Sequence, residues 1–260
     1  MSLFILAKLI FLNYNYFNMN ELKLFNLKLN TFGFNEVLDK IDEFIKGDKC
    51  AHIVTLSTEM VMHSEKDKLF SDIENSASLV TPDSAGIVWA VKKLYKKRIE
   101  KVSGVDLVRE ICRISGVKGW KLFILGSTEE SLLEAVRKLK EKYKDINIAG
   151  CHNGYFKDDE KVLNYINEKS PDILFVALGS PRQEFWISKH KEKLNAKVAI
   201  GVGGSFDVIS GKFKRAPQWM VKSSLEWLYR LITQPKRFIR MLAIPRFMTK
   251  VYLKLLSGKK

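Results

Sequence analysis

Hydrophobic and polar positions along the 260-residue chain follow two alternating patterns. Short, nearly continuous apolar runs are typical of buried strands, and apolar residues spaced three and four apart are typical of amphipathic helices. The strand pattern occurs at residues 22–30, 51–56, 77–81, 120–125, 146–151, 172–177 and 196–202. The helix pattern occurs at residues 34–46, 58–74, 85–97 and 104–115, and again after the strands that end near 126 and 178.

This alternation predicts an α/β fold with a Rossmann-like, mostly parallel sheet that is covered by helices on both faces. In such sheets, ligands bind beyond the carboxyl ends of the strands. The positions expected at this rim are Thr55, Asp83, Gly126, Ser127 and residues 179–183 and 201–207.

The two ends of the chain differ from this pattern. Residues 216–260 contain no strand pattern and read as two or three helices, punctuated by Pro235 and Pro245. The N-terminal apolar run is shorter than the ~20 residues that span a bilayer, and no small-residue cleavage site of a signal peptide follows it. We therefore expect a dispensable extension at 1–18, an α/β core at 19–215 and a helical appendage at 216–260.

The positive charge is concentrated in the last fifth of the chain. Of the net +15, residues 212–260 carry +12, with 13 Lys and Arg residues against the single acid Glu226. Such a basic segment suggests nucleic acid, phosphate ligands or an anionic membrane as a partner. Apolar residues such as Trp227 and Phe238 interleave with the charges, which favours a membrane surface.

The cysteines and histidines give no sign of a metal site. Cys50, Cys112 and Cys151 lack paired spacing and are typical of reduced core residues in a cytoplasmic protein. The four histidines are scattered, no His/Cys cluster has metal-ligand spacing, and no Asp-x-Asp occurs. We expect no metal and no cofactor.

Asp83 follows the apolar run that ends at Thr81 and Pro82, directly before a helix pattern. Two interpretations are open. Aspartate commonly caps helices, and a carboxylate at the rim of a sheet can also act as a general base. From the residues alone, the capping interpretation is favoured.

Two further segments have competing interpretations. In the helix that begins near 180, Ser180 is expected as the cap, Pro181 as the first helical residue and Gln183 as part of a capping box. These roles leave Glu184 unexplained, and a polar pair at a helix start on the rim can also hold a ligand. The glycine-rich residues 201–212 fit neither the dinucleotide fingerprint nor the phosphate-binding P-loop. They suit either a tight turn or a close approach of backbone N–H groups to a phosphate or uracil.

Three arginines of the basic segment, Arg230, Arg237 and Arg240, lie seven and three residues apart. This spacing places them near one helical face if Pro235 only bends the path. Arginine binds phosphate in a bidentate manner. A solvated basic face is the alternative.

Together these motifs resemble one family, the WecG/TagA/CpsF glycosyltransferases (glycosyltransferase family 26). The similarity runs from about residue 21 to 241. It is carried by Thr-Leu-Ser-Thr-Glu at 55–59, Pro-Asp-Ser at 82–84, Ser-Gly-Val-Asp-Leu at 103–107, Leu-Gly-Ser-Pro-Arg-Gln-Glu-Phe-Trp at 178–186, Gly-Val-Gly-Gly-Ser-Phe-Asp at 201–207, Arg-Ala-Pro at 215–217 and Glu-Trp-Leu-Tyr-Arg-Leu at 226–231.

The resemblance implies inverting transfer of a sugar, N-acetylmannosamine in the teichoic-acid members, from a UDP-sugar to undecaprenyl-diphosphate-linked N-acetylglucosamine. It implies that Asp83 is the catalytic base, that Thr55 and Gln183 are active-site polar residues, and that Arg230, Arg237 and Arg240 act on the diphosphate. With the base assigned to Asp83, capping can occur alongside catalysis. The other residues expected to bind substrate are Ser57, Ser103, Asp106, Gly126, Ser127, Gly179, Ser180, Arg182, Gly203, Gly204, Asp207 and Arg215.

The same resemblance implies a peripheral enzyme on the cytoplasmic face of the bacterial plasma membrane, with a homodimer as a further expectation and no nucleic-acid partner. The chain has Ser84, Ser57-Thr58 and Lys101 where the family often has Gly, Asn-Pro and Arg, which bears on the donor sugar.

Two other classes of protein remain as alternatives. A nucleotide-dependent oxidoreductase would need a glycine fingerprint, which fails at Phe206. A nucleic-acid-binding module would bind with a steep salt dependence.

Overall fold

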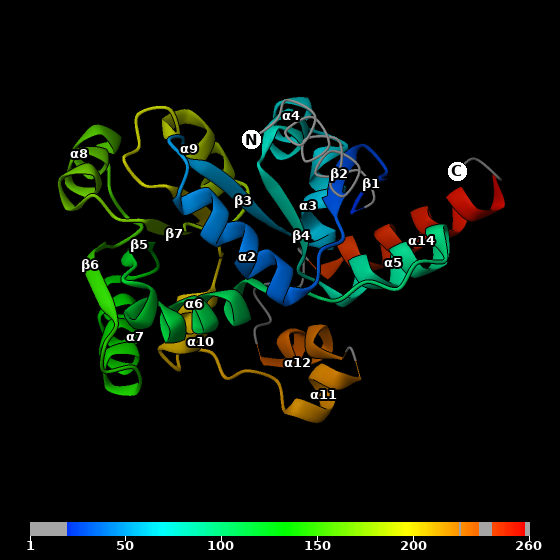
Figure 1. Ribbon diagram of the computed structural model, residues 1–260. Coiled ribbons are helices and arrows are strands. Elements are labelled where there is room, and N and C mark those ends of the chain that lie inside the picture. Colours follow the sequence, from blue (N-terminus) through cyan, green and yellow to red (C-terminus); the bar gives the residue numbers. More distant parts are fainter. Residues whose placement is uncertain (1–19, 224, 234–240, 258–260) are drawn as a thin grey trace, which may run out of the picture.

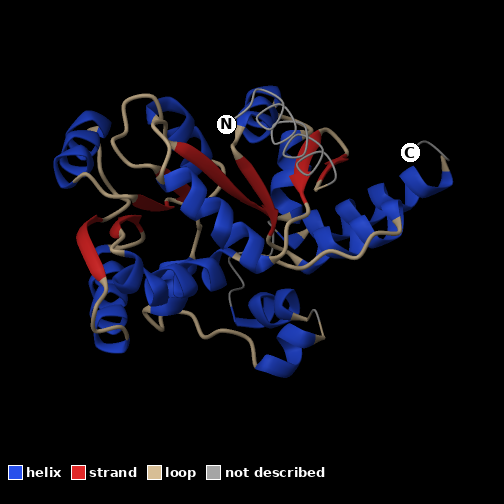
Figure 2. Cartoon of the chain, in the orientation of Figure 1, coloured by secondary structure: helices blue, strands red, loops and turns tan. Residues whose placement is uncertain are grey.

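The computed structural model describes residues 20–223, 225–233 and 241–257. Its centre is a six-stranded, all-parallel sheet with the strand order β4-β3-β8-β7-β5-β6 (Figures 1 and 2). The strands are β3 (Ala51–Leu56), β4 (Leu79–Pro82), β5 (Lys121–Gly126), β6 (Asn147–His152), β7 (Ile173–Ala177) and β8 (Val198–Gly201). The predicted parallel sheet is confirmed.

Helices cover both faces of this sheet, as predicted. One face packs against α2 (Phe34–Ile45), α6 (Gly104–Lys118), α7 (Glu129–Lys142) and the short α10 (Ser205–Ile209). The other face packs against α3 (Thr58–Ser64), α4 (Lys68–Ser76), α5 (Ala85–Tyr95), α8 (Asp159–Lys169), α9 (Arg182–His190) and α14 (Ala243–Leu256). Successive strand residues point to opposite faces. In β3, for example, Ile53 joins the first core and Val54 the second, and both are fully buried. A strand buried on both faces has to be apolar throughout, which is the pattern that the sequence shows.

The first predicted strand, at residues 22–30, is instead an antiparallel hairpin of β1 (Glu21–Leu24) and β2 (Leu27–Asn30). Phe25 takes a positive φ of 57° at the turn. The apolar alternation changes phase at this turn, from Leu22 and Leu24 to Leu27 and Leu29, because the leucines on both strands face the same core. This change of phase at Phe25 and Asn26 is the mark of the hairpin in the sequence.

The helix pattern at residues 58–74 is divided into α3 and α4. Asp67 begins the second helix, because its carboxylate accepts a hydrogen bond from the backbone N–H of Phe70 at 3.0 Å. An N-cap of this kind starts a new helix, so one amphipathic pattern spans two helices.

The C-terminal segment forms α11 (Gln218–Lys222), α12 (Glu226–Thr233) and α14 among the described residues. Helix α14 packs beside α3 and α5 (Figure 1), and its Phe247 and Val251 are fully buried in the second core. Its Lys250 pairs with Glu65 and lies over the ring of Phe25. The division of the chain at 215 stays a prediction, but α14 contributes two buried side chains to the second core.

No helix within the described ranges is both long enough and apolar enough to cross a membrane.

Candidate active site

The predicted catalytic residues meet at the carboxyl ends of β3, β4 and β8. Asp83 follows β4, and its Oδ1 accepts a hydrogen bond from the backbone N–H of Gly104 at 2.8 Å. Gly104 is the first residue of α6, so the carboxylate lies at the positive end of a 15-residue helix. This contact orients the carboxylate and favours its negative charge.

The capping interpretation of Asp83 is wrong for the helix that follows it. Ser84 is the N-cap of α5, and its side chain accepts a hydrogen bond from the N–H of Ile87. Ser84 caps α5, the helix that follows it. Asp83 instead accepts from the first residue of α6, 21 residues further along the chain.

Thr55 lies between two glycine backbones. Its hydroxyl donates to the carbonyl oxygen of Gly201 at 2.8 Å. On the other side, a Cβ placed on Gly104 would lie only 3.3 Å from the Thr55 Oγ1. Thr55 thus joins the end of β8 to the start of α6, where Asp83 is held.

Gln183 completes this set from α9. Its Oε1 accepts from the backbone N–H of Gly203 at 2.9 Å, and its Nε2 donates to Oε1 of Glu184 at 2.6 Å. A Cβ on Gly201 would lie 2.7 Å from that Nε2, closer than real Cβ atoms approach, so any other residue here would displace the Gln183 amide. The structure therefore brings Asp83, Thr55 and Gln183 together through Gly104 and Gly201.

The predicted roles of Ser180 and Gln183 as helix caps are wrong. The N-cap of α9 is Pro181, which makes no side-chain cap. The Gln183 amide is engaged as described above, and the Ser180 side chain counteracts the rise in the pKa of Glu184 that burial causes. Both side chains serve contacts within the site and leave the helix start uncapped.

Asp106 and Arg215 form an ion pair beside this set. Two nitrogens of Arg215 donate to the two carboxylate oxygens of Asp106, each at 2.7 Å, and the Ser103 hydroxyl donates to Oδ2 of Asp106 at 2.8 Å. Burial alone would raise the pKa of Asp106, but the hydrogen bonds from Arg215 and Ser103 outweigh it and hold the pKa below its usual value. The pair fixes the loop before α11 to the start of α6.

The positive charge of Arg215 also acts on Asp83. The hydrogen bond to Asp106 raises the pKa of Arg215, and the nearby charges of Glu226 and Asp83 raise it further. Lys101 adds a second cation, 3.4 Å from the carboxylate of Glu226. On this side of the site, the carboxylates of Asp83 and Glu226 therefore lie near the cations Arg215 and Lys101.

A second group of predicted residues lies at the ends of β5 and β7. The Ser127 hydroxyl donates to Oδ1 of Asp207 at 2.7 Å. Arg182 donates to the carbonyl oxygen of Gly154 at 2.8 Å, and its guanidinium lies over the Phe156 ring at 5.1 Å. The chain leaves β5 toward α7 on one face and β7 toward α9 on the other face. Such a switch between neighbouring strands is where α/β sheets bind ligands.

Glycines shape this rim. Gly126 has a φ of +131°, and a Cβ there would lie 2.4 Å from the backbone of Ala177, so only glycine fits. Gly179, with a φ of +77°, and Gly203, with a φ of +51°, face open space. Their backbones can be approached closely by a ligand. Gly204 begins the short helix α10.

Among the remaining predicted residues, Ser57 serves as the N-cap of α3 and accepts from the N–H of Met60. Arg230 lies in α12, but its side chain is outside the described part, as are Arg237 and Arg240 altogether. Within the described residues, no group of three or more His, Cys, Asp and Glu side chains could hold a metal ion.

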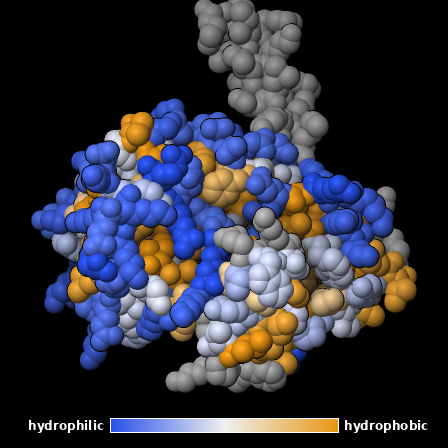
Figure 3. Space-filling model, turned by 90° about the horizontal axis from the view of Figure 1, so that it is seen from below, coloured by the Kyte–Doolittle hydropathy of each residue, from blue (hydrophilic) through white to orange (hydrophobic). Residues whose placement is uncertain are grey.

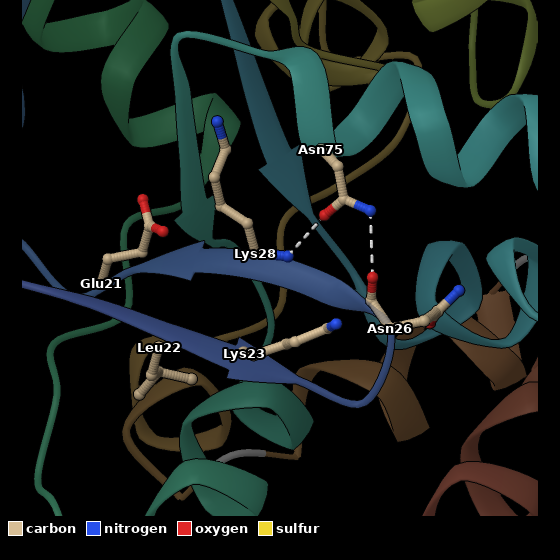
Figure 4. Close-up of a pocket in the computed structure, with 6 residues that line it drawn as sticks. All are labelled: Glu21, Leu22, Lys23, Asn26, Lys28 and Asn75. Atoms are coloured by element: carbon tan, nitrogen blue, oxygen red, sulfur yellow. Dashed lines mark hydrogen bonds between the residues drawn. The ribbon is translucent and has the colours of Figure 1, made fainter. Parts of the chain in front are cut away.

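A hollow lies away from these residues, against the β1–β2 hairpin (Figure 4). There Asn75 of α4 accepts from the backbone N–H of Lys28 at 2.8 Å and donates to the carbonyl oxygen of Asn26 at 3.0 Å. None of the predicted site residues lines this hollow, and its contacts tie the hairpin to α4.

Comparison with known proteins identifies the family. The sequence pattern of the Glycosyl transferase WecG/TagA/CpsF family matches residues 22–260. The chain belongs to this family.

Relatives with the name N-acetylglucosaminyldiphosphoundecaprenol N-acetyl-beta-D-mannosaminyltransferase are similar over most of their length. The protein of Bacillus spizizenii is 35% identical over 233 residues, which cover 90% of this chain and 89% of the relative. That of Bacillus subtilis is 36% identical over 84% of each chain, and one from Staphylococcus aureus is 36% identical over 76% of this chain and 78% of its own. Membership in a glycosyltransferase family leaves the oxidoreductase and nucleic-acid alternatives unsupported.

Sequence reasoning missed several residues of this glycosyltransferase site. Gly104 and Gly201 lie in segments that the sequence had singled out, but nothing in those segments indicated that their backbones join the three predicted catalytic residues. Glu184 drew notice only because capping did not explain it. Glu74, which is fully buried in α4, reads as an ordinary polar position of an amphipathic helix. Only the packing of α4 on α9 could have revealed its burial.

Proposed function

We propose that this glycosyltransferase moves N-acetylmannosamine from a UDP-linked donor to undecaprenyl-diphosphate-linked N-acetylglucosamine, with inversion at the anomeric carbon. The observation that carries the proposal is the continuous set of contacts from Asp83 through Gly104, Thr55 and Gly201 to Gln183. The names of the relatives support the choice of substrates.

In the proposed reaction, Asp83 takes the proton of an acceptor hydroxyl while that oxygen attacks the anomeric carbon of the donor. The bond from this carbon to the diphosphate breaks, and UDP leaves with the bonding electrons. General base catalysis requires the base within about 3 Å of the hydroxyl, and the Gly104 N–H fixes the direction of the carboxylate. Thr55 and Gln183 lie at the same rim of the sheet, joined to Asp83 through Gly104 and Gly201.

We place the donor nucleotide at the switch between β5 and β7, where Ser127, Gly179, Arg182 and Asp207 lie. The open space beside Gly179 admits a ligand to the backbone, and the guanidinium of Arg182 adds positive charge. The departing diphosphate needs cations near it. Arg215 supports this role from beside Asp83, together with Arg230, Arg237 and Arg240 from the C-terminal segment.

The lipid-linked acceptor calls for a membrane surface, and we propose that the C-terminal helices bind it peripherally on the cytoplasmic face. Trp219 of α11 and Trp227 and Ile232 of α12 are 62%, 42% and 71% exposed. Figure 3 views the molecule from the side of α11 and α12, and hydrophobic residues are exposed there among hydrophilic ones. Each basic residue near an anionic leaflet contributes about 1 kcal/mol, and apolar side chains add to this.

The direct test of the reaction is a product assay with purified lipid acceptor and a panel of UDP-sugars. We expect transfer from UDP-N-acetylmannosamine. Transfer only from its uronic acid or only from UDP-glucose would show that the proposed donor is wrong. Absence of any transfer would refute the function.

The membrane proposal has a separate test, sedimentation with anionic vesicles. Trp227→Ala with Ile232→Ser should weaken binding, whereas Leu69→Ser, at a residue 63% exposed on α4, should not. Equal loss in both variants would refute the assignment of this face. Analytical ultracentrifugation tests the homodimer, which we also propose: a single species at the monomer mass would refute it.

A further inference from the structure

Two acidic side chains are buried where α4 packs against α9. Glu74 and Glu184 are both 0% exposed. The rings of Phe70 and Phe185, from the same two helices, lie 6.0 Å apart at this interface. Burying a carboxyl group in such a place costs free energy unless it is hydrogen-bonded or neutral. Stability alone therefore gives no reason for two carboxyls here.

The two carboxyls affect each other. Burial raises the pKa of both, and the charge of Glu184 raises that of Glu74 further. Two neighbouring buried carboxyls do not both ionise readily. The Gln183 amide donates to Glu184, and such a donor favours the charged form of that carboxyl. Glu184 is therefore the member of the pair whose charged form is favoured.

Glu184 is connected directly to the proposed active site. Its Oε1 accepts from the amide of Gln183, and the other end of that amide accepts from the N–H of Gly203. An amide that donates to Glu184 can present only its oxygen to Gly203. The side chains of Gln183 and Glu184 also lie close to Gly201. A Cβ added at Gly201 would lie 3.2 Å from the Glu184 carboxylate.

We propose that Glu184 is a positioning residue for the transfer reaction: its buried carboxyl group holds the Gln183 amide, and through it the loop at residues 202–204. This inference rests on the proposed function. It assigns a role to a side chain that lies behind the rim of the site. Displacement of an active-site group by about 1 Å can lower the rate about 10²-fold.

The first experiment compares two replacements of Glu184. Glu184→Met keeps the shape but removes the acceptor, so turnover should fall about 10²-fold. Glu184→Gln keeps an oxygen that can accept from Gln183, so turnover should stay within about tenfold of wild type. The fall should lie in kcat, with UDP affinity by calorimetry changing less. Wild-type turnover of Glu184→Met, or equal loss in both variants, would overturn the proposal.

A double variant separates positioning from stability. Glu74→Met with Glu184→Met removes both buried carboxyls, and replacing buried charged groups by apolar ones is often neutral or stabilising. We expect a Tm at or above that of wild type, together with the low turnover of Glu184→Met. As a control at the same interface, Phe70→Leu should lower the Tm. At temperatures below its melting range, this variant should keep wild-type turnover. A double variant with wild-type turnover would refute the role.

Hydrogen exchange gives a readout that does not depend on catalysis. In Glu184→Met the amide of Gly203 should exchange faster than in wild type, and in Phe70→Leu it should not. If wild type transfers no sugar but exchange responds as expected, the proposed function fails and the structural link stands. If exchange at Gly203 is unchanged in Glu184→Met, the positioning inference fails even if the transfer is observed.

Discussion

Replacing Asp83 by Asn separates its chemical role from its structural one. In the wild type, the N–H of Gly104 donates to Oδ1 of Asp83 at 2.8 Å. Asn keeps an oxygen that can accept this hydrogen bond. What changes is the charge. A hydrogen bond to a charged group contributes about 1.5–3 kcal/mol and a neutral one about 0.5–1.5 kcal/mol. For this contact, the expected loss of stability is therefore about 1–1.5 kcal/mol, or a fall in Tm of about 2–6 °C for a chain of this size.

Turnover should respond much more strongly than stability. A general base contributes roughly 10²–10⁴ in rate, so Asp83→Asn should lose that factor while UDP affinity stays near wild type. Asp83→Ala should lose the same factor in turnover. It should also unfold more easily, because the N–H of Gly104 loses its partner at a cost of about 1–3 kcal/mol.

A matched control lies in α4. Asp67 makes the same kind of contact, accepting from the N–H of Phe70 at 3.0 Å, but it caps a helix away from the rim. Asp67→Asn should lower the Tm slightly and leave turnover unchanged. The assays are thermal unfolding, UDP calorimetry and turnover on the lipid acceptor. Near-wild-type turnover of Asp83→Asn would refute its role as the base.

Three further outcomes are expected. Gly201→Ala should cost about 1–3 kcal/mol by overpacking and lower turnover, because its Cβ would displace the Gln183 amide; wild-type unfolding and transfer curves would contradict this. The pKa of Asp106 is lowered in the folded protein, so its pairing with Arg215 stabilises the fold at neutral pH and this stability is lost as the pH falls through the folded pKa, below its usual value near 3.8. The difference in Tm between wild type and Asp106→Asn should accordingly shrink in acid, and a difference independent of pH would speak against the pair. Transfer should survive EDTA, since the sequence has no metal-ligand spacing, and a loss restored by Mg²⁺ or Mn²⁺ would show that this interpretation is wrong.

The sequence by itself determined the sheet and most of its helices. A strand buried on both faces must be apolar throughout, so runs such as residues 51–56 and 172–177 identify their own strands. Amphipathic periodicity likewise reports on a single helix and the face that it buries. These signals are local, and they identified the rim on which Thr55, Asp83 and Gln183 lie.

The partners of those side chains were decided only by the tertiary structure. Aspartate before a helix usually caps it, and from the chain alone nothing distinguished that cap from a contact to Gly104, 21 residues away. The sequence gives no sign that Glu74 is buried, because its burial depends on α9, a helix more than a hundred residues further along. Local patterns indicate the secondary structure of a segment and the face that it buries. Which group supplies a hydrogen bond, and which carboxyl loses contact with water, depends on how distant segments pack together.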